Sequence, residues 1–95
     1  MKVTLVYTMK GCPYCVMIKE ELKKNQIIFI ERDIDEYEEE YNDFAEAVGN
    51  EYVPALMLLT LNEADKPENV TLLAPTRDFD DINEGVEIVK NYLLD

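Results

Sequence analysis

The residues best suited to chemistry are two cysteines, Cys12 and Cys15, with Pro13 and Tyr14 between them. Disulfide exchange needs a thiolate that attacks a disulfide, and often a second thiol close enough to resolve the mixed disulfide that forms. When the first cysteine stands at the start of a helix, the second lies one turn inside it, and the two sulfur atoms come within bonding distance. The spacing therefore predicts a redox-active pair.

Position in the helix predicts different roles for the two thiols. Unpaired backbone N–H groups and the positive end of the helix dipole stabilise an anion at a helix start, so we expect the pKa of Cys12 to lie below the free-thiol value of about 8.5. Lys10 adds a nearby positive charge. Cys15 shares a helix face with Ile18 and Leu22, which predicts an inward-facing thiol. Cys12 is therefore the expected nucleophile and Cys15 the resolving thiol.

The composition limits other chemistry at the cysteines. A structural zinc site needs four ligands, whereas the chain has two cysteines and no histidine, so we expect no metal unless a second chain supplies ligands. Two unreactive buried cysteines are the other alternative. The lack of histidine also excludes Cys–His nucleophilic catalysis. The carboxylates of Glu38, Glu39 and Glu40 are interpreted as a solvated helix face.

The length and the charge of the chain limit the class of protein that it can be. The 95 residues suffice for one domain with a modest core and not for two. Nine Lys and Arg residues against 21 Asp and Glu residues give a formal charge of −12, which disfavours nucleic acid and anionic membranes as partners. The carboxylates could select a basic partner surface or serve solubility alone. With no export signal and no apolar stretch of the ~20 residues that span a bilayer, we expect a cytoplasmic monomer.

The elements around the cysteines are predicted from hydrophobic periodicity. Residues 2–8 are apolar on both faces, as in an internal strand. A helix follows from Pro13 to about Lys24, because proline is favoured at a first helical position. Residues 27–30 are a short β-branched and aromatic run, which predicts a second strand. The pattern therefore predicts a β-α-β unit with the cysteines at its turn.

The rest of the chain adds a helix, two strands and a last helix. Tyr37, Tyr41, Phe44 and Val48 recur at helical spacing, and Gly49 fits a helix end. The expected elements are a helix over residues 36–48, strands over residues 55–59 and 70–73 with a long tip around residues 62–69, and a helix that starts near Asp80 and Asp81. The complete order is β-α-β-α-β-β-α.

The segment around the cysteines resembles the glutaredoxin family. Val6-Tyr7-Thr8 and Gly11-Cys12-Pro13-Tyr14-Cys15 are similar to the family's first strand and active-site turn, and Val53-Pro54 is similar to its cis-proline loop. The resemblance implies an α/β, thioredoxin-like fold with a four-stranded mixed sheet flanked by helices, as one glutaredoxin domain over residues 1–95. It also implies thiol–disulfide oxidoreductase activity on protein or glutathione mixed disulfides, with glutathione as a reductant that is not tightly bound.

The resemblance also implies roles for residues outside the cysteine pair. Tyr14 would flank the bound thiol, and Val53 would offer its backbone to an extended substrate beside a cis Pro54. Near Asp80 and Asp81, backbone N–H groups would meet the γ-glutamyl carboxylate of glutathione, and helix capping by these residues is compatible with that role. The implied site for substrate or glutathione consists of Lys10, Pro13, Tyr14, Val53, Pro54, Asp80 and Asp81.

Departures from the family pattern keep a second hypothesis open. Met9 stands where the family commonly has a lysine, and a Gln or Arg of the family's second helix falls at or near Tyr41. Arg77 and Asp78 stand where the family has a Gly-Gly pair that lets the backbone approach a ligand, and Arg77 could supply a substitute cation. The alternative is a thioredoxin-like electron donor to a partner such as ribonucleotide reductase, recharged by a flavoprotein reductase.

A third hypothesis is a dimeric scaffold that binds an iron–sulfur cluster through Cys12 and two glutathiones. In the resembling family, a proline after the first cysteine tends to accompany redox activity rather than cluster storage. Pro13 therefore favours the oxidoreductase.

Overall fold

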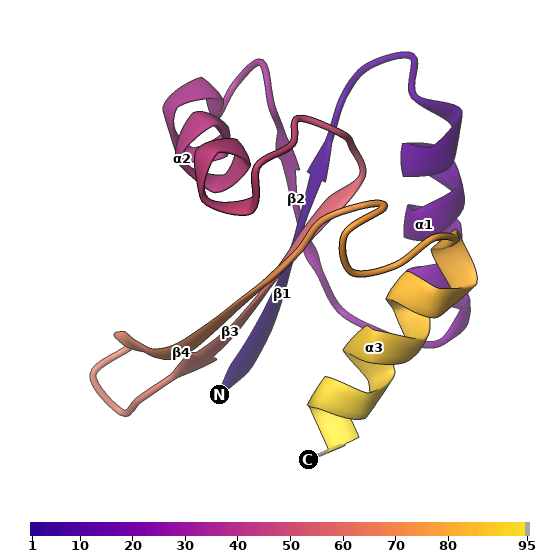
Figure 1. The fold of residues 1–95 in the computed structure, drawn as a ribbon. Coiled ribbons are helices and arrows are strands. Elements are labelled where there is room, and N and C mark those ends of the chain that lie inside the picture. The colour runs from indigo at the N-terminus through magenta and orange to yellow at the C-terminus, as the bar shows by residue number, and fades with distance from the viewer. Residues whose placement is uncertain (95) are drawn as a thin grey trace.

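The computed structural model describes residues 1–94 and has the predicted order β-α-β-α-β-β-α. The strands are β1 (Lys2–Thr8), β2 (Ile30–Asp33), β3 (Ala55–Leu61) and β4 (Pro67–Leu73), and the helices are α1 (Pro13–Lys24), α2 (Glu38–Val48) and α3 (Ile82–Leu94). Figure 1 shows α1 and α3 on one face of the sheet and α2 on the other. The bounds of β1 and α1 agree with the prediction.

The four strands form one mixed sheet in the order β2-β1-β3-β4. β1 runs parallel to β2, with Leu5 opposite Ile30, and antiparallel to β3, with Leu5 opposite Met57. A parallel pair needs a crossover, which α1 supplies here. Because β1 is central and ends at Thr8, the cysteine turn that follows it emerges at one end of the sheet.

Alternate residues of β1 face different layers of the molecule. Val6 belongs to the core beneath α1 and α3, whereas Tyr7 belongs to the core beneath α2, and neither is exposed. The Tyr7 hydroxyl donates a hydrogen bond to Glu40 Oε2 of α2 at 2.7 Å. Burial, together with that carboxylate, raises the pKa of Tyr7 well above its usual value. The strand that leads to the cysteines is thus fixed from both sides.

The second strand lies later in the chain than predicted. The sequence pattern predicts a strand over residues 27–30, whereas β2 is Ile30–Asp33. Ile27 is buried just after α1, where its N–H donates to the Leu22 carbonyl at 2.9 Å, and Ile28 is 90% exposed. β2 is an edge strand whose side chains reach solvent and the neighbouring helices, so its sequence contains no apolar run that would identify it as a strand.

The start of α2 also differs from the prediction. The helix is predicted from residue 36 and begins at Glu38, because residues 33–37 form a turn. In that turn the N–H of Asp35 donates to Asp33 Oδ1 at 2.9 Å, and the N–H of Tyr37 donates to the Asp33 carbonyl at 3.0 Å. Tyr37 is therefore the N-cap and lies at the surface, rather than on the inner face of the helix.

The β3–β4 hairpin has a shorter tip than predicted. The pattern predicts strands over residues 55–59 and 70–73 with a tip around residues 62–69, but both strands continue farther toward the tip. Asn62 closes the connection: its N–H donates to the Lys66 carbonyl at 2.9 Å, and its side-chain oxygen accepts from the N–H of Lys66 at 3.1 Å. β4 can begin at Pro67, because a proline at the first residue of an edge strand removes no hydrogen bond between the strands.

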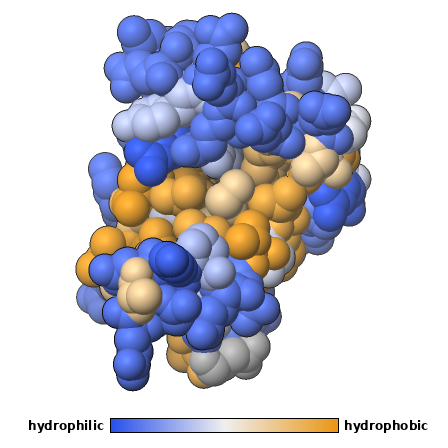
Figure 2. All heavy atoms as spheres, turned by 90° about the vertical axis from the view of Figure 1, so that its left-hand side faces the viewer, coloured by the Kyte–Doolittle hydropathy of each residue, from blue (hydrophilic) through white to orange (hydrophobic). Residues whose placement is uncertain are grey.

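α2 covers only part of its face of the sheet. Met57 and Leu72 pack partly against the cluster beneath α2, and Val70, on the same side of β4 as Leu72, is 52% exposed. Figure 2 shows exposed apolar side chains between two hydrophilic regions on this side of the molecule. The cysteines belong to the opposite layer, which α1 and α3 form.

The helices of residues 1–94 are short. The longest, α3, has 13 residues. None of them combines the length and the apolar character that a bilayer crossing requires.

Candidate active site

The turn between β1 and α1 places Cys12 at the N-cap of the helix. Gly11 has φ = 76°, a backbone conformation that side-chain-bearing residues rarely adopt, and Cys12 returns to extended backbone with φ = −100° and ψ = 106°. Pro13 occupies the first helical position, where its missing N–H costs nothing. Cys12 Sγ accepts a hydrogen bond from the backbone N–H of Cys15 at 3.1 Å. The sulfur thus takes the capping role that an oxygen usually has.

Cys12 and Cys15 form a disulfide, with their Cα atoms 5.2 Å apart. One helical turn therefore brings the two sulfur atoms together, as the spacing predicts. Both residues are buried, Cys12 with 8% and Cys15 with 2% of its surface exposed. Cys15 is buried in the same helix as Ile18 and Leu22, which agrees with its predicted inward direction. Cys12 is the more accessible of the two, which is compatible with its predicted role as the nucleophile.

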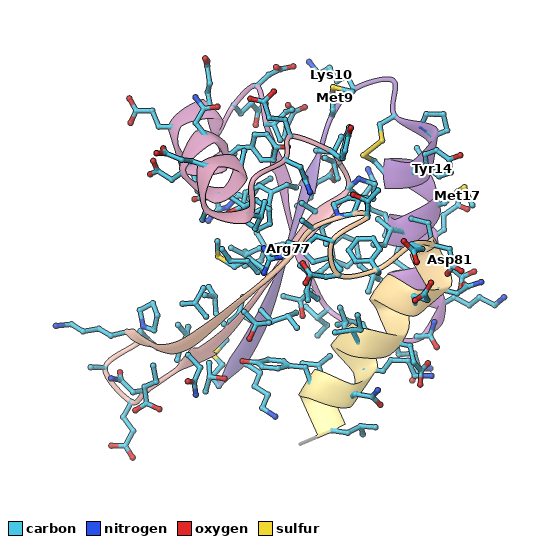
Figure 3. All side chains as sticks on the ribbon, viewed as in Figure 1. Met9, Lys10, Tyr14, Met17, Arg77 and Asp81 are labelled. Atoms are coloured by element: carbon cyan, nitrogen blue, oxygen red, sulfur yellow. A yellow bond between two sulfur atoms is a disulfide. The ribbon has the colours of Figure 1, made fainter. Side chains whose placement is uncertain are left out.

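A cavity of about 640 Å³ lies between α1, the loop before β3 and the start of α3. We call it the α1–α3 groove. Its lining brings together Tyr14, Val53, Pro54, Asp80 and Asp81, five of the seven residues expected around a substrate or glutathione. The peptide bond between Val53 and Pro54 is cis, as the resemblance implies. Figure 3 shows Tyr14, Met17 and Asp81 one below the other on the right of the view, along α1 and the start of α3.

The other two expected residues lie elsewhere. Lys10 and Pro13 line a second cavity, of about 430 Å³, together with both cysteines. We call it the cysteine cavity. In Figure 3, Met9 and Lys10 lie on the turn above the disulfide, away from Asp81. The structure therefore divides the expected binding residues between two cavities, of which only the cysteine cavity is lined by Cys12 and Cys15.

An ionic network lines the cysteine cavity. Glu31 Oε2 accepts hydrogen bonds from Thr8 Oγ1 at 2.7 Å and from Lys19 Nζ at 2.9 Å. The Thr8 hydrogen bond, then the Lys19 ammonium, lower the pKa of the Glu31 carboxyl. Lys19 thus balances Glu31, and the other charged residues that line the cavity are Lys10 and Asp33, which have opposite signs.

The segment before α3 is held by its own side chains. Asp78 Oδ2 accepts from the N–H of Ala74 at 2.7 Å and lies 3.4 Å from Arg77 Nε. Asp81 Oδ1 accepts from the N–H of Glu84 at 2.9 Å, which confirms the predicted N-cap. Arg77 does not line the α1–α3 groove, and Figure 3 shows it well away from Asp81. The side chain considered as a substitute cation is therefore paired with its neighbour.

Tyr41, which stands near the family's Gln or Arg position on the second helix, is not in the α1–α3 groove. It is buried beneath α2, and its hydroxyl donates to the Tyr52 carbonyl at 3.5 Å. This position therefore contributes to packing in the core beneath α2.

Sequence reasoning missed part of the groove. Met17, Glu20 and Glu21 of α1 line it, as does the buried ring of Phe79. A signal was present in the spacing, because Met17 and Glu21 follow Tyr14 at i+3 and i+7 and so share its helix face. Phe79 packs against α3 at Gly85, where an added Cβ would come within 3.2 Å of its ring. No pattern of residue spacing in the sequence predicts that contact.

Metal ligands do not gather in the described chain. Across residues 1–94, no three or more His, Cys, Asp or Glu side chains are grouped so that they could hold a metal ion.

Comparisons with known proteins match this geometry. A family model described as Glutaredoxin matches residues 4–58, a range that includes both cysteines and Val53–Pro54. No curated protein matches the chain. Two solved structures are described as the thioredoxin-like protein BC3987, one of them as a mutant, and each has 20% sequence identity to this chain. The mutant superposes with a TM-score of 0.57 and covers 95% of this chain and 97% of its own. The other superposes with a TM-score of 0.56 and covers 93% of this chain and 96% of its own. A structure described as a malarial protein has 22% identity, a TM-score of 0.53 and 98% of each chain covered. These likenesses establish the predicted thioredoxin-like fold.

The network around Glu31 generates a prediction about pH. Because the folded state lowers the pKa of Glu31, its carboxylate stabilises the fold above the pKa of the unfolded chain, and this contribution is lost as the pH falls through the lower, folded value. Glu31→Gln should therefore reduce the urea midpoint at neutral pH and have little effect in acid. Glu46→Gln, an exposed position on α2, is the control. An equal loss for Glu31→Gln at both pH values would contradict the assignment.

Proposed function

Since the chain belongs to the glutaredoxin family, we propose that it reduces disulfides through a Cys12/Cys15 dithiol cycle, with glutathione as the reductant that restores the two thiols. Its substrates would be protein disulfides and mixed disulfides with glutathione. The observation that carries the proposal is the Cys12–Cys15 disulfide at the N-terminus of α1, in a cavity that both cysteines line, with Tyr14 between them in sequence lining the α1–α3 groove.

The proposed cycle transfers two electrons to the substrate. The Cys12 thiolate attacks one sulfur of a substrate disulfide, forms a mixed disulfide and releases the other substrate sulfur as a thiolate, which takes a proton from water. The Cys15 thiolate then attacks Cys12 Sγ, forms the Cys12–Cys15 disulfide and releases the second substrate thiol. Two molecules of glutathione return the electrons and leave as glutathione disulfide.

The helix start supports Cys12 as the attacking group. Its sulfur lies where backbone N–H groups converge and already accepts one of them. The same cavity is lined by two cations and two carboxylates: Lys19 is paired with Glu31, and Lys10 and Asp33 are the other two. Cys15, which is more buried, is better suited to attack a neighbour than an incoming disulfide.

The α1–α3 groove supports a substrate that approaches in extended form. Val53, next to the cis Pro54, would offer backbone hydrogen-bonding groups to such a segment, as a strand edge does. The Tyr14 ring is 62% exposed and lines the groove, so it would flank the bound thiol. All of these groups belong to one chain, so a monomer suffices. A reducing compartment such as the cytoplasm would supply the glutathione.

One observation favours a second candidate function. Within residues 1–94, no Lys or Arg side chain lines the α1–α3 groove, although glutathione presents two carboxylates. The second candidate is a thioredoxin-like electron donor with little glutathione dependence, recharged by a flavoprotein reductase and acting on a partner such as ribonucleotide reductase.

A coupled assay separates the two candidates. We expect turnover of a glutathione mixed disulfide when glutathione, glutathione reductase and NADPH are supplied, with NADPH oxidation as the readout. The parallel assay replaces glutathione and its reductase with a thioredoxin reductase. Negligible turnover in the first assay and rapid turnover in the second would contradict glutathione as the source of electrons and favour the flavoprotein reductase.

The two thiols should respond differently to substitution. Cys12→Ser should abolish all exchange, because the attacking sulfur is gone. Cys15→Ser should keep reduction of glutathione mixed disulfides, which needs only the first thiol, and lose reduction of protein disulfides that need the second. Both variants are assayed on both substrate types. The assignment of roles would be wrong if Cys15→Ser were the more damaging change in each assay.

A further inference from the structure

The charged side chains that line the α1–α3 groove are all acidic. Glu20 and Glu21 of α1 line one side, and Asp80 and Asp81 at the start of α3 line the other. Each carries a formal negative charge at pH 7, and within residues 1–94 no lysine or arginine lines the groove. A ligand in the groove therefore meets four carboxylates.

These carboxylates have no cation of their own in the described chain. The ion pairs of residues 1–94 are Lys19–Glu31, Arg32–Glu40, Arg77–Asp78 and Lys90–Glu87, and none includes a groove carboxylate. Asp81 accepts one backbone hydrogen bond as the N-cap of α3. Their charge is therefore available to a ligand.

The charged residues of α1 line different cavities. Lys19 and Lys23, four residues apart, line a cavity on the β2 side of the helix together with Glu31. Glu20 and Glu21 line the groove on the α3 side. Lys24 follows Glu20 at i+4 and so shares its side of the helix, but it does not line the groove. Of the charged side chains on α1, only carboxylates therefore line the groove.

The groove also offers apolar contact. Tyr14, Met17, Phe79 and Ile82 lie among its carboxylates. The side chains of lysine and arginine combine an aliphatic stem with a charged head, so they fit a surface on which apolar patches and carboxylates alternate. The lining suits such side chains better than it suits glutamate or the carboxylates of glutathione.

We infer that the α1–α3 groove selects protein disulfides whose cysteines are flanked by lysine or arginine in an extended segment. The inference rests on the proposed function, because the groove is a substrate site only if Tyr14 and Pro54, which line it, flank a disulfide bound at Cys12; the carboxylates only set its preference. Opposite charge raises the rate of encounter, and added salt screens it. The preference should therefore be largest at low ionic strength.

Two synthetic peptides test the preference. They share length, an internal disulfide and a fluorophore quenched in the disulfide form, and differ only in flanking residues, which are lysines in one and glutamates in the other. Reduced protein is mixed with each peptide without glutathione, so a single reduction is observed. We expect the lysine peptide to react about tenfold faster at low salt, with the ratio approaching one at high salt. Equal rates at low salt, or a faster glutamate peptide, would overturn the inference.

A pair of double variants locates the effect. Glu20→Gln with Glu21→Gln removes two charges from the groove, and Glu39→Gln with Glu46→Gln removes two from the exposed side of α2, beyond the sheet. The first variant should lower the lysine-to-glutamate rate ratio several-fold, and the second should leave it unchanged. An equal fall in both variants would assign the preference to net charge and overturn the role of the groove.

The outcomes distinguish this inference from the function on which it rests. If the unaltered protein reduces neither peptide and no glutathione mixed disulfide, the proposed function fails. If it reduces both peptides at the same rate, the function stands and only the charge preference fails.

Discussion

The proposed chemistry depends on one contact, the hydrogen bond from the Cys15 N–H to the sulfur of Cys12 at the start of α1. The contact requires a helix that begins at the first cysteine, which Pro13 favours, and a chain that turns sharply after β1, which the left-handed backbone of Gly11 allows. Val6 and Tyr7 pack into different cores and hold the strand that leads to this turn. A fixed strand would keep the sulfur proposed to attack in place.

The two cavities differ in charge. The cysteine cavity is lined by two cations, Lys10 and Lys19, and by two carboxylates, Glu31 and Asp33, so its formal charge is balanced. The α1–α3 groove is lined by carboxylates without a lysine or arginine in the described chain, and this negative charge favours a basic substrate. Lys19 and the pair Glu20 and Glu21 lie on different sides of α1, which separates the two cavities. The distribution of charge between the cavities therefore bears on the choice of substrate more than the net charge of −12 does.

The sequence predicts the parts of this arrangement that arise locally. The spacing of Cys12 and Cys15 and the helix from Pro13 follow from contacts within one turn, and the structure has both. The position of β2 does not follow, because an edge strand is fixed by its neighbour rather than by its own apolar residues. The groove is missed in part because its lining comes from three segments that only the fold brings together. Arg77 illustrates the same limit, since it is paired with Asp78 and does not line the groove.

The most direct test of this account is the pH dependence of alkylation at each cysteine of the fully reduced protein, followed by mass spectrometry of the peptides. The account predicts that Cys12 is alkylated first and that its reaction reaches half its maximal rate at a lower pH than that of free cysteine, while Cys15 reacts slowly. Equal reaction of the two, or a Cys12 that reacts like free cysteine, would contradict it.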